Sequence, residues 1–83
     1  MMGIEEVDEN DFITFDGFDA AIIGHGTQFN TNLIIYDYKK CLEILVSRDG
    51  MEWVEAEEYM SFNVIGAWVG KNTPVFLYGT GKP

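Results

Sequence analysis

The sequence predicts an α+β fold, in which a small three-stranded sheet carries two principal α-helices on one face in the order β-(α)-β-α-α-β. Three observations support this prediction. An unbroken apolar run over 33–36 is typical of a buried strand. Two amphipathic stretches follow it, with Gly50 between them, and a second short apolar run over 75–78 comes last. Strands on both sides of a helical hairpin favour one sheet with the helices packed against it.

Length and composition indicate a single domain. The chain has 83 residues, of which 47% are hydrophobic and 14% aromatic. These proportions suffice for a packed core and are far from those of a disordered chain. We expect a flexible acidic leader at 1–11, one compact domain at 12–78 and a short tail at 79–83.

The first third of the domain gives weaker signals. Residues 12–15 form a short β candidate that ends at the turn signal of residues 16–17. The helical spacing of the apolar residues then predicts a short helix over 19–23, with a second strand over 20–23 as the alternative. Residues 24–32 contain few apolar side chains, so we expect a loop or a bent entry into the next strand.

The two principal helices have recognisable ends. Asp37 is suited to cap the first helix, predicted over 38–47, because its carboxylate can accept hydrogen bonds from the free amides of the first turn. Gly50 can adopt the left-handed conformation that ends such a helix. The second helix is predicted over 52–63, and both tryptophans of the chain are expected in the core. The whole predicted core comprises Ile13, Phe15, Ile22, Ile35, Cys41, Leu42, Leu45, Ala56, Met60, Ile65, Val75 and Leu77.

The charge of the chain is strongly unbalanced. Fourteen acidic residues oppose five basic ones, which gives a formal net charge of −9. Nucleic-acid phosphates and anionic membranes should repel such a chain, so we expect neither as a direct partner. The apolar runs are also too short to span a bilayer. A partner protein with a basic surface fits the charge better, although negative charge can also simply keep a small domain soluble.

The acidic residues of the second helix are the predicted partner-binding site: Glu52, Glu55, Glu57 and Glu58. Carboxylates spaced along a rigid helix can imitate phosphates and occupy a groove lined by Arg and Lys. An exposed tryptophan or tyrosine would add an anchor to such a contact. This pattern predicts a non-enzymatic interaction module, and it leaves open whether the chain also forms a homodimer.

An alternative function is a small-ligand site or a minimal active site in the predicted loop Gly24-His25-Gly26-Thr27, with His25 and Thr27 as the ligand-binding residues. A dinucleotide fingerprint would need a third glycine and a following helix, which this segment lacks. One His and one Cys cannot build a structural zinc site. The sequence singles out no pair among the many carboxylates, so it predicts no catalytic residue, metal or cofactor.

The single cysteine, Cys41, falls on the apolar side of the first predicted helix and has no partner for an internal disulfide. Secreted domains of this size are usually stabilised by disulfides. We therefore expect a reducing, cytoplasmic setting, with Cys41 as a buried core thiol.

Several segments of the chain together form a distinctive string: Tyr36–Leu45, Arg48–Met51, Phe62–Gly70 and Thr73–Phe76. This string resembles that of a family of small uncharacterised proteins of tailed phages and bacteria, and the resemblance covers most of the chain, residues 18–77. It implies a phage or prophage context, in which the chain would act on a host protein in the host cytoplasm. The family has no known activity, so the resemblance implies no functional residue. Relatives often open the second helix with a small polar residue, and because Glu52 stands there in this chain we do not predict a capping box.

Overall fold

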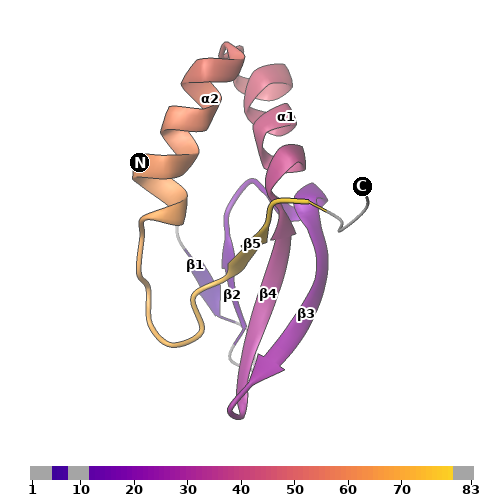
Figure 1. The fold of residues 1–83 in the computed structure, drawn as a ribbon, viewed down its shortest axis with the longest axis vertical. Helices are drawn as coiled ribbons and strands as arrows, with labels where there is room; N and C mark the ends of the chain where they lie inside the picture. The colour runs from indigo at the N-terminus through magenta and orange to yellow at the C-terminus, as the bar shows by residue number, and fades with distance from the viewer. Residues whose placement is uncertain (1–4, 8–11, 80–83) are drawn as a thin grey trace.

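The computed structural model describes residues 5–7 and 12–79 (Figure 1). It confirms the α+β fold class, with a three-stranded mixed sheet and two helices. The elements in chain order are β1 (Glu5–Val7), β2 (Ile13–Phe15), the single 3₁₀ turn η1 (Asp19–Ala21), β3 (Ile22–Gln28), β4 (Thr31–Asp37), α1 (Tyr38–Asp49), α2 (Trp53–Tyr59), the π-helical turns η2 (Met60–Ile65) and β5 (Val75–Leu77).

The three-stranded sheet has the order β3-β4-β5, with β4 in the centre. β3 and β4 form an antiparallel hairpin whose two-residue turn is Phe29–Asn30, with φ angles of 51° and 67°. Two positive φ values are the signature of the turn type that matches the twist of a β-hairpin. β5 runs parallel to β4, because the helical segment and the loop after it carry the chain back to the other end of the sheet.

Two predictions about the sheet are wrong. The strand predicted over 12–15 does not join the sheet, since β2 pairs antiparallel with β1 in a separate two-stranded sheet. Its expected place is taken by β3, which covers the last two residues of the predicted short helix and the first five of the predicted loop. The 3₁₀ turn η1 occupies the first three residues of that predicted helix. The pairing of β1 also gives residues 5–7 of the predicted flexible leader a regular structure. Residues 1–4 and 8–11 of the leader and most of the predicted tail lie outside the described residues.

Strand β3 escaped prediction because two of its residues on one face are glycines. Ile22, Gly24 and Gly26 are half-buried, while Ile23, His25 and Thr27 are exposed. A register shift between Ile22 and Gly24 puts these two residues on opposite faces of the sheet. Ile22 faces the core, whereas Gly24 and Gly26 lie on the other face. Glycine has no side chain, however, so the apolar periodicity that normally signals a strand is missing from the sequence.

The capping residues of α1 are those predicted. The Asp37 carboxylate accepts a hydrogen bond from the Lys40 amide at 3.3 Å, and Gly50 follows the helix with φ at 72°. The helix extends to Asp49, two residues beyond the predicted end at Ser47. In this last turn, Nη1 of Arg48 donates to the carbonyl oxygen of Gly17 at 2.7 Å, which links the end of the helix to the segment after β2.

Helix α2 continues without a break into η2, so the second helical segment ends at Ile65, beyond the predicted end at Asn63. The Glu52 amide donates to Oε1 of Glu55 at 2.9 Å. This hydrogen bond is one half of a capping box, which corrects the expectation that Glu52 excludes such a cap.

The core lies between the helices, β2 and one face of the three-stranded sheet. Tyr36 of β4 is fully buried, and its ring stacks on Phe76 of β5 with 5.3 Å between ring centres. Phe15 of β2 closes this aromatic cluster, 5.9 Å from Phe76. The other buried residues of the cluster come from η1, its flank and the helices: Phe18, Ala21, Cys41, Leu42, Leu45, Ala56, Met60 and Val64.

The predicted core is confirmed for seven residues, which are Ile13, Phe15, Cys41, Leu42, Leu45, Ala56 and Met60. Ile22, Ile35 and Ile65 are only half-buried, and the prediction is wrong for β5. Val75 and Leu77 are each 42% exposed, because Phe76 between them is the residue of β5 that turns toward Tyr36. Both tryptophans are exposed as well, Trp53 by 41% and Trp68 by 76%. Trp53 opens α2 and Trp68 follows the end of the helical segment.

Candidate functional site

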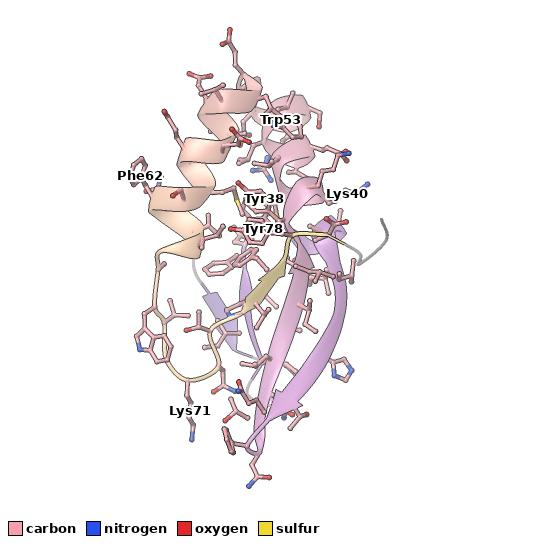
Figure 2. The ribbon with its side chains drawn as sticks, in the orientation of Figure 1. Tyr38, Lys40, Trp53, Phe62, Lys71 and Tyr78 are labelled. Carbon is pink, nitrogen blue, oxygen red and sulfur yellow. The ribbon has the colours of Figure 1, made fainter. Side chains whose placement is uncertain are left out.

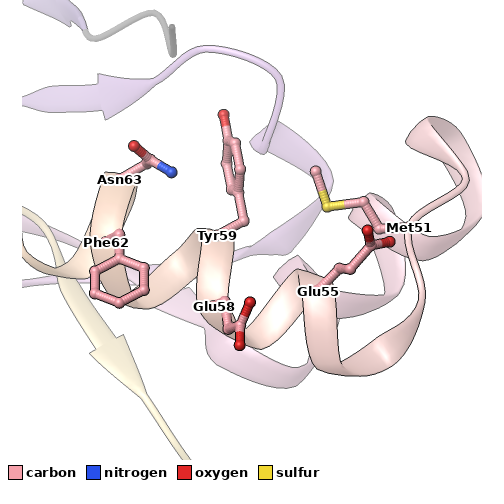
Figure 3. Close-up of a pocket in the computed structure, with 6 residues that line it drawn as sticks. All are labelled: Met51, Glu55, Glu58, Tyr59, Phe62 and Asn63. Carbon is pink, nitrogen blue, oxygen red and sulfur yellow. The ribbon is translucent and has the colours of Figure 1, made fainter.

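An open groove of about 310 Å³ runs along the outer side of α2 and η2 (Figure 3). We call it the α2 groove. The two-helix unit that carries the groove lies at the end of the molecule opposite the β3–β4 turn (Figure 1). The residues that line it are Met51, Glu55, Glu58, Tyr59, Phe62 and Asn63.

Helical periodicity explains why these side chains meet. Glu55, Glu58 and Phe62 are spaced by three and four residues, and such positions share one face of a helix. Tyr59 lies beside them but is half-buried, because its ring also packs against the core. The groove therefore has an apolar inner wall and an anionic rim.

Phe62 is the most unusual member of this groove. Its side chain is 77% exposed, although phenylalanine is a residue that folding normally buries. Figure 2 shows it pointing outward from the helix, away from the sheet. An exposed ring beside two carboxylates can contact a cation with its face while the carboxylates pair with the charge.

The structure brings together only two of the four glutamates predicted as the partner-binding site. Glu55 and Glu58 line the α2 groove, whereas Glu52 begins the helix and its amide is held by Glu55. Glu57 lies toward another side, near Tyr38: burial raises the pKa of Tyr38, and Tyr78 and the charge of Glu57 raise that pKa further. The four carboxylates are thus distributed over more than one face of the helix.

Tyr38 and Tyr78 form a second exposed aromatic feature. Their rings stack with 4.3 Å between centres and an angle of 21° (Figure 2). Tyr78 is 65% exposed, and Tyr38 opens α1. This pair joins the end of β5 to the beginning of α1 and lies apart from the residues of the α2 groove.

The predicted ligand-binding loop is an extended strand. His25 and Thr27 are exposed on β3, with their side chains on the same face of the strand. The His25 ring meets the edge of Phe12 at 5.3 Å, and the Thr27 hydroxyl donates to Oδ1 of Asn32 at 3.3 Å. The two residues therefore sit on an open, regular surface, and the loop on which the ligand-site prediction depended is absent from this part of the chain.

The described residues offer little support for a reactive cysteine, a metal site or a membrane span. Cys41 is fully buried, and burial raises the pKa of its thiol to about 12, so it is held in the unreactive protonated form. Within 5–7 and 12–79, no three His, Cys, Asp or Glu side chains are grouped as metal ligands would be. None of the helices in these ranges is both long and apolar enough to cross a bilayer.

Sequence reasoning found the carboxylates of the groove and missed its apolar members. Phe62 follows Glu58 by four residues, and this spacing could have placed it on the same face. The signal was overlooked because aromatic residues in an amphipathic helix usually face inward. No protein-family model, curated protein sequence or solved structure matches this chain.

Proposed function

We propose that the protein is a non-enzymatic interaction module whose α2 groove binds a basic segment of a partner protein. The observation that carries the proposal is that Glu55, Glu58 and the exposed ring of Phe62 line one groove. The groove has a volume of about 310 Å³, at the lower limit of ligand pockets, and so suits one or two long side chains.

Arginine and lysine are the side chains that this groove suits best. Either can pack its apolar stem against Phe62 and Met51 while its charge meets the two carboxylates. Arginine has the additional advantage that its planar guanidinium can bind a carboxylate through two parallel hydrogen bonds. The formal net charge of −9 would accelerate the approach of a basic partner from any direction.

The more specific form of this proposal is a phage-encoded modulator that acts in the host cytoplasm on a host protein with a basic surface. It rests on the charge of the chain and on the resemblance to small phage proteins. If that surface normally binds nucleic acid, Glu55 and Glu58 would take the place of phosphates. Glu57 would contribute less, because it lies toward Tyr38 and outside the groove.

No observation on the described residues favours the alternative of a small-ligand site at His25 and Thr27. Both belong to regular strand, and the partners found for them are Phe12 and Asn32, which lie on neighbouring surface segments.

A titration with an arginine-rich synthetic peptide tests the proposal. NMR spectra of the labelled protein should show the largest shifts at Glu55, Glu58 and Phe62, and the affinity should fall as salt rises. The double variant Glu55→Gln/Glu58→Gln should weaken binding by about tenfold or more, which corresponds to roughly 1.4 kcal/mol. Phe62→Ala should also weaken binding without unfolding the protein, because the ring is largely exposed.

The matched control is Glu43→Gln/Glu57→Gln, which removes the same charge from exposed positions outside the groove. This variant should bind nearly as well as the original protein. If the two double variants lose affinity equally, only the total charge matters and the groove has no role. Affinity that does not respond to salt would contradict the electrostatic basis of the proposal.

A further inference from the structure

The three-stranded sheet has one face that no helix or strand of the described chain covers. In Figure 1 the two-stranded sheet of β1 and β2 lies behind β4 and β5, and the front of the sheet is free. The residues on this side alternate with Tyr36 and Phe76, which turn to the core. We call this side the open face; it is formed by Gly24 and Gly26 of β3, Leu33 and Ile35 of β4, and Val75 and Leu77 of β5.

The open face is apolar and carries almost no charge. Val75 and Leu77 are each 42% exposed, and Leu33 and Ile35 are only partly buried although β4 is the central strand. No Asp, Glu, Lys or Arg occurs between Asp19 and Asp37 or between Lys71 and Lys82. Asp37 at the rim is engaged as the cap of α1. On a chain with a net charge of −9, this is a surface where two copies can meet without opposing carboxylates.

Two glycines lie on this face, Gly24 at the register shift that follows Ile22 and Gly26 within regular pairing. Gly24 and Gly26 do not have positive φ angles, so any residue could adopt their backbone conformation. A Cβ atom at Gly24 would meet nothing within 4 Å, and one at Gly26 would make an ordinary contact of 3.5 Å with Ile35. Glycine inside a strand weakens the strand and often marks a bulge, which fits Gly24, or a place where another backbone approaches closely, which remains the explanation for Gly26.

The shape of the open face allows two copies of it to fit together. Its β3 side is flat because of the glycines, and its β5 side is raised by Val75 and Leu77. Gly24, Ile35 and Val75 lie at the same level across the three strands. A two-fold axis parallel to β4 would therefore put Gly24 of each copy opposite Val75 of the other, whereas an axis across the strands would stack glycine on glycine and leave a gap.

We propose that the open face is a dimer interface, through which two copies of this chain pack sheet against sheet about a two-fold axis parallel to β4. Isologous dimers of this kind are the commonest oligomers, and aligned packing of two sheets is a usual way to bury their apolar faces. Leu33 and Ile35 of both copies form the centre of the interface. The α2 groove lies on a different element and stays available to a partner, so the dimer does not depend on the proposed function.

Sedimentation analysis of the full chain, from micromolar to millimolar concentration and at low and high salt, tests this proposal. The protein should be dimeric at the higher concentrations. Added salt should tighten the dimer, because it screens the repulsion between two copies of charge −9 while leaving the apolar contact in place. This response is opposite to that expected for a basic partner in the α2 groove, so the two proposals can fail separately.

Gly24→Val is the decisive variant. It should raise the dimer dissociation constant by about tenfold or more, equivalent to roughly 1.4 kcal/mol, because the flat place opposite Val75 is filled. Its thermal stability as a monomer should not fall, since the added side chain meets open space and valine favours strands. The matched control is Thr27→Val, which adds the same side chain to the other side of β3 and should leave dimerisation unchanged.

Val75→Asp provides a second perturbation at a position that is already 42% exposed, so its folding is not in question. It should also abolish the dimer, by placing a charge in the apolar contact. A chain that stays monomeric at every concentration and salt overturns the proposal. So does a dimer that tolerates both Gly24→Val and Val75→Asp, or one that Thr27→Val weakens as much as Gly24→Val, because the contact would then lie on another surface.

Discussion

The hydroxyl of Tyr36 offers the sharpest test of how this small core is held together. Tyr36 is fully buried, and its hydroxyl oxygen accepts a hydrogen bond from the Phe15 amide at 2.7 Å. This bond joins β4 to β2, two strands that belong to different sheets. Tyr36→Phe removes one oxygen atom and keeps the ring that stacks on Phe76.

The expected cost follows from the amide that is left behind. Phe15 is only 1% exposed, so its amide cannot turn to water once the acceptor is gone. An unsatisfied buried donor costs about 1–3 kcal/mol. A chain of this length has a total stability of about 4–12 kcal/mol, so the loss is a large fraction of it.

Urea unfolding followed by circular dichroism measures this loss. With an m-value of ~1 kcal/mol/M, at the low end for small domains, the midpoint should fall by about 1–3 M. The control is Tyr38→Phe, whose hydroxyl lies at a half-exposed position and should contribute less than about 0.5 kcal/mol. Equal stability of Tyr36→Phe and the original protein would refute the reasoning, since it would mean that the Phe15 amide does not depend on this oxygen.

Four further predictions concern pH, thiol reactivity and the backbone. Burial raises the pKa of Tyr36 from 10.0 to about 12 and that of Cys41 from 9.0 to about 12. Both groups therefore contribute fully to the stability of the folded state below pH 9, and this contribution is lost as the pH rises toward 12. The urea midpoint should fall over this pH range, and it should fall less steeply in Tyr36→Phe. Native Cys41 should resist a thiol-reactive dye until urea unfolds the chain; rapid labelling of the folded protein would contradict its burial. Gly50→Ala should lower the free energy of unfolding by about 1 kcal/mol, because φ is 72° at this position. Phe29→Asn should raise it by about a few tenths of a kcal/mol, since Asn accepts the φ of 51° better than Phe does. Thermal unfolding of the two variants tests both signs.

The helical part of this protein could be predicted because its signals are local. The Asp37 cap, the Gly50 stop and the burial of Cys41 each depend on neighbours within a few residues, and all three are present in the structure. The strand over 33–36 could be recognised for a similar reason, since its apolar run lies within the sequence of β4.

The candidate site was only half visible in the sequence. The carboxylates of the second helix were conspicuous as a group, but their division between the α2 groove and the side near Tyr38 depends on how α2 packs against α1. Phe62 joins the groove for the same reason. A helical pattern indicates which residues share a face, and only packing decides which face is left exposed.

The sequence by itself determined the fold class, the two capping residues of α1, the buried residues of that helix and a formal net charge of −9. Only the tertiary structure decided that β3 replaces the predicted first strand, that Phe76 and not its neighbours turns inward, and that one face of the sheet stays uncovered. The physical reason is that strand pairing joins residues far apart in the chain, and glycines at 24 and 26 contribute no side chain from which that pairing could be inferred.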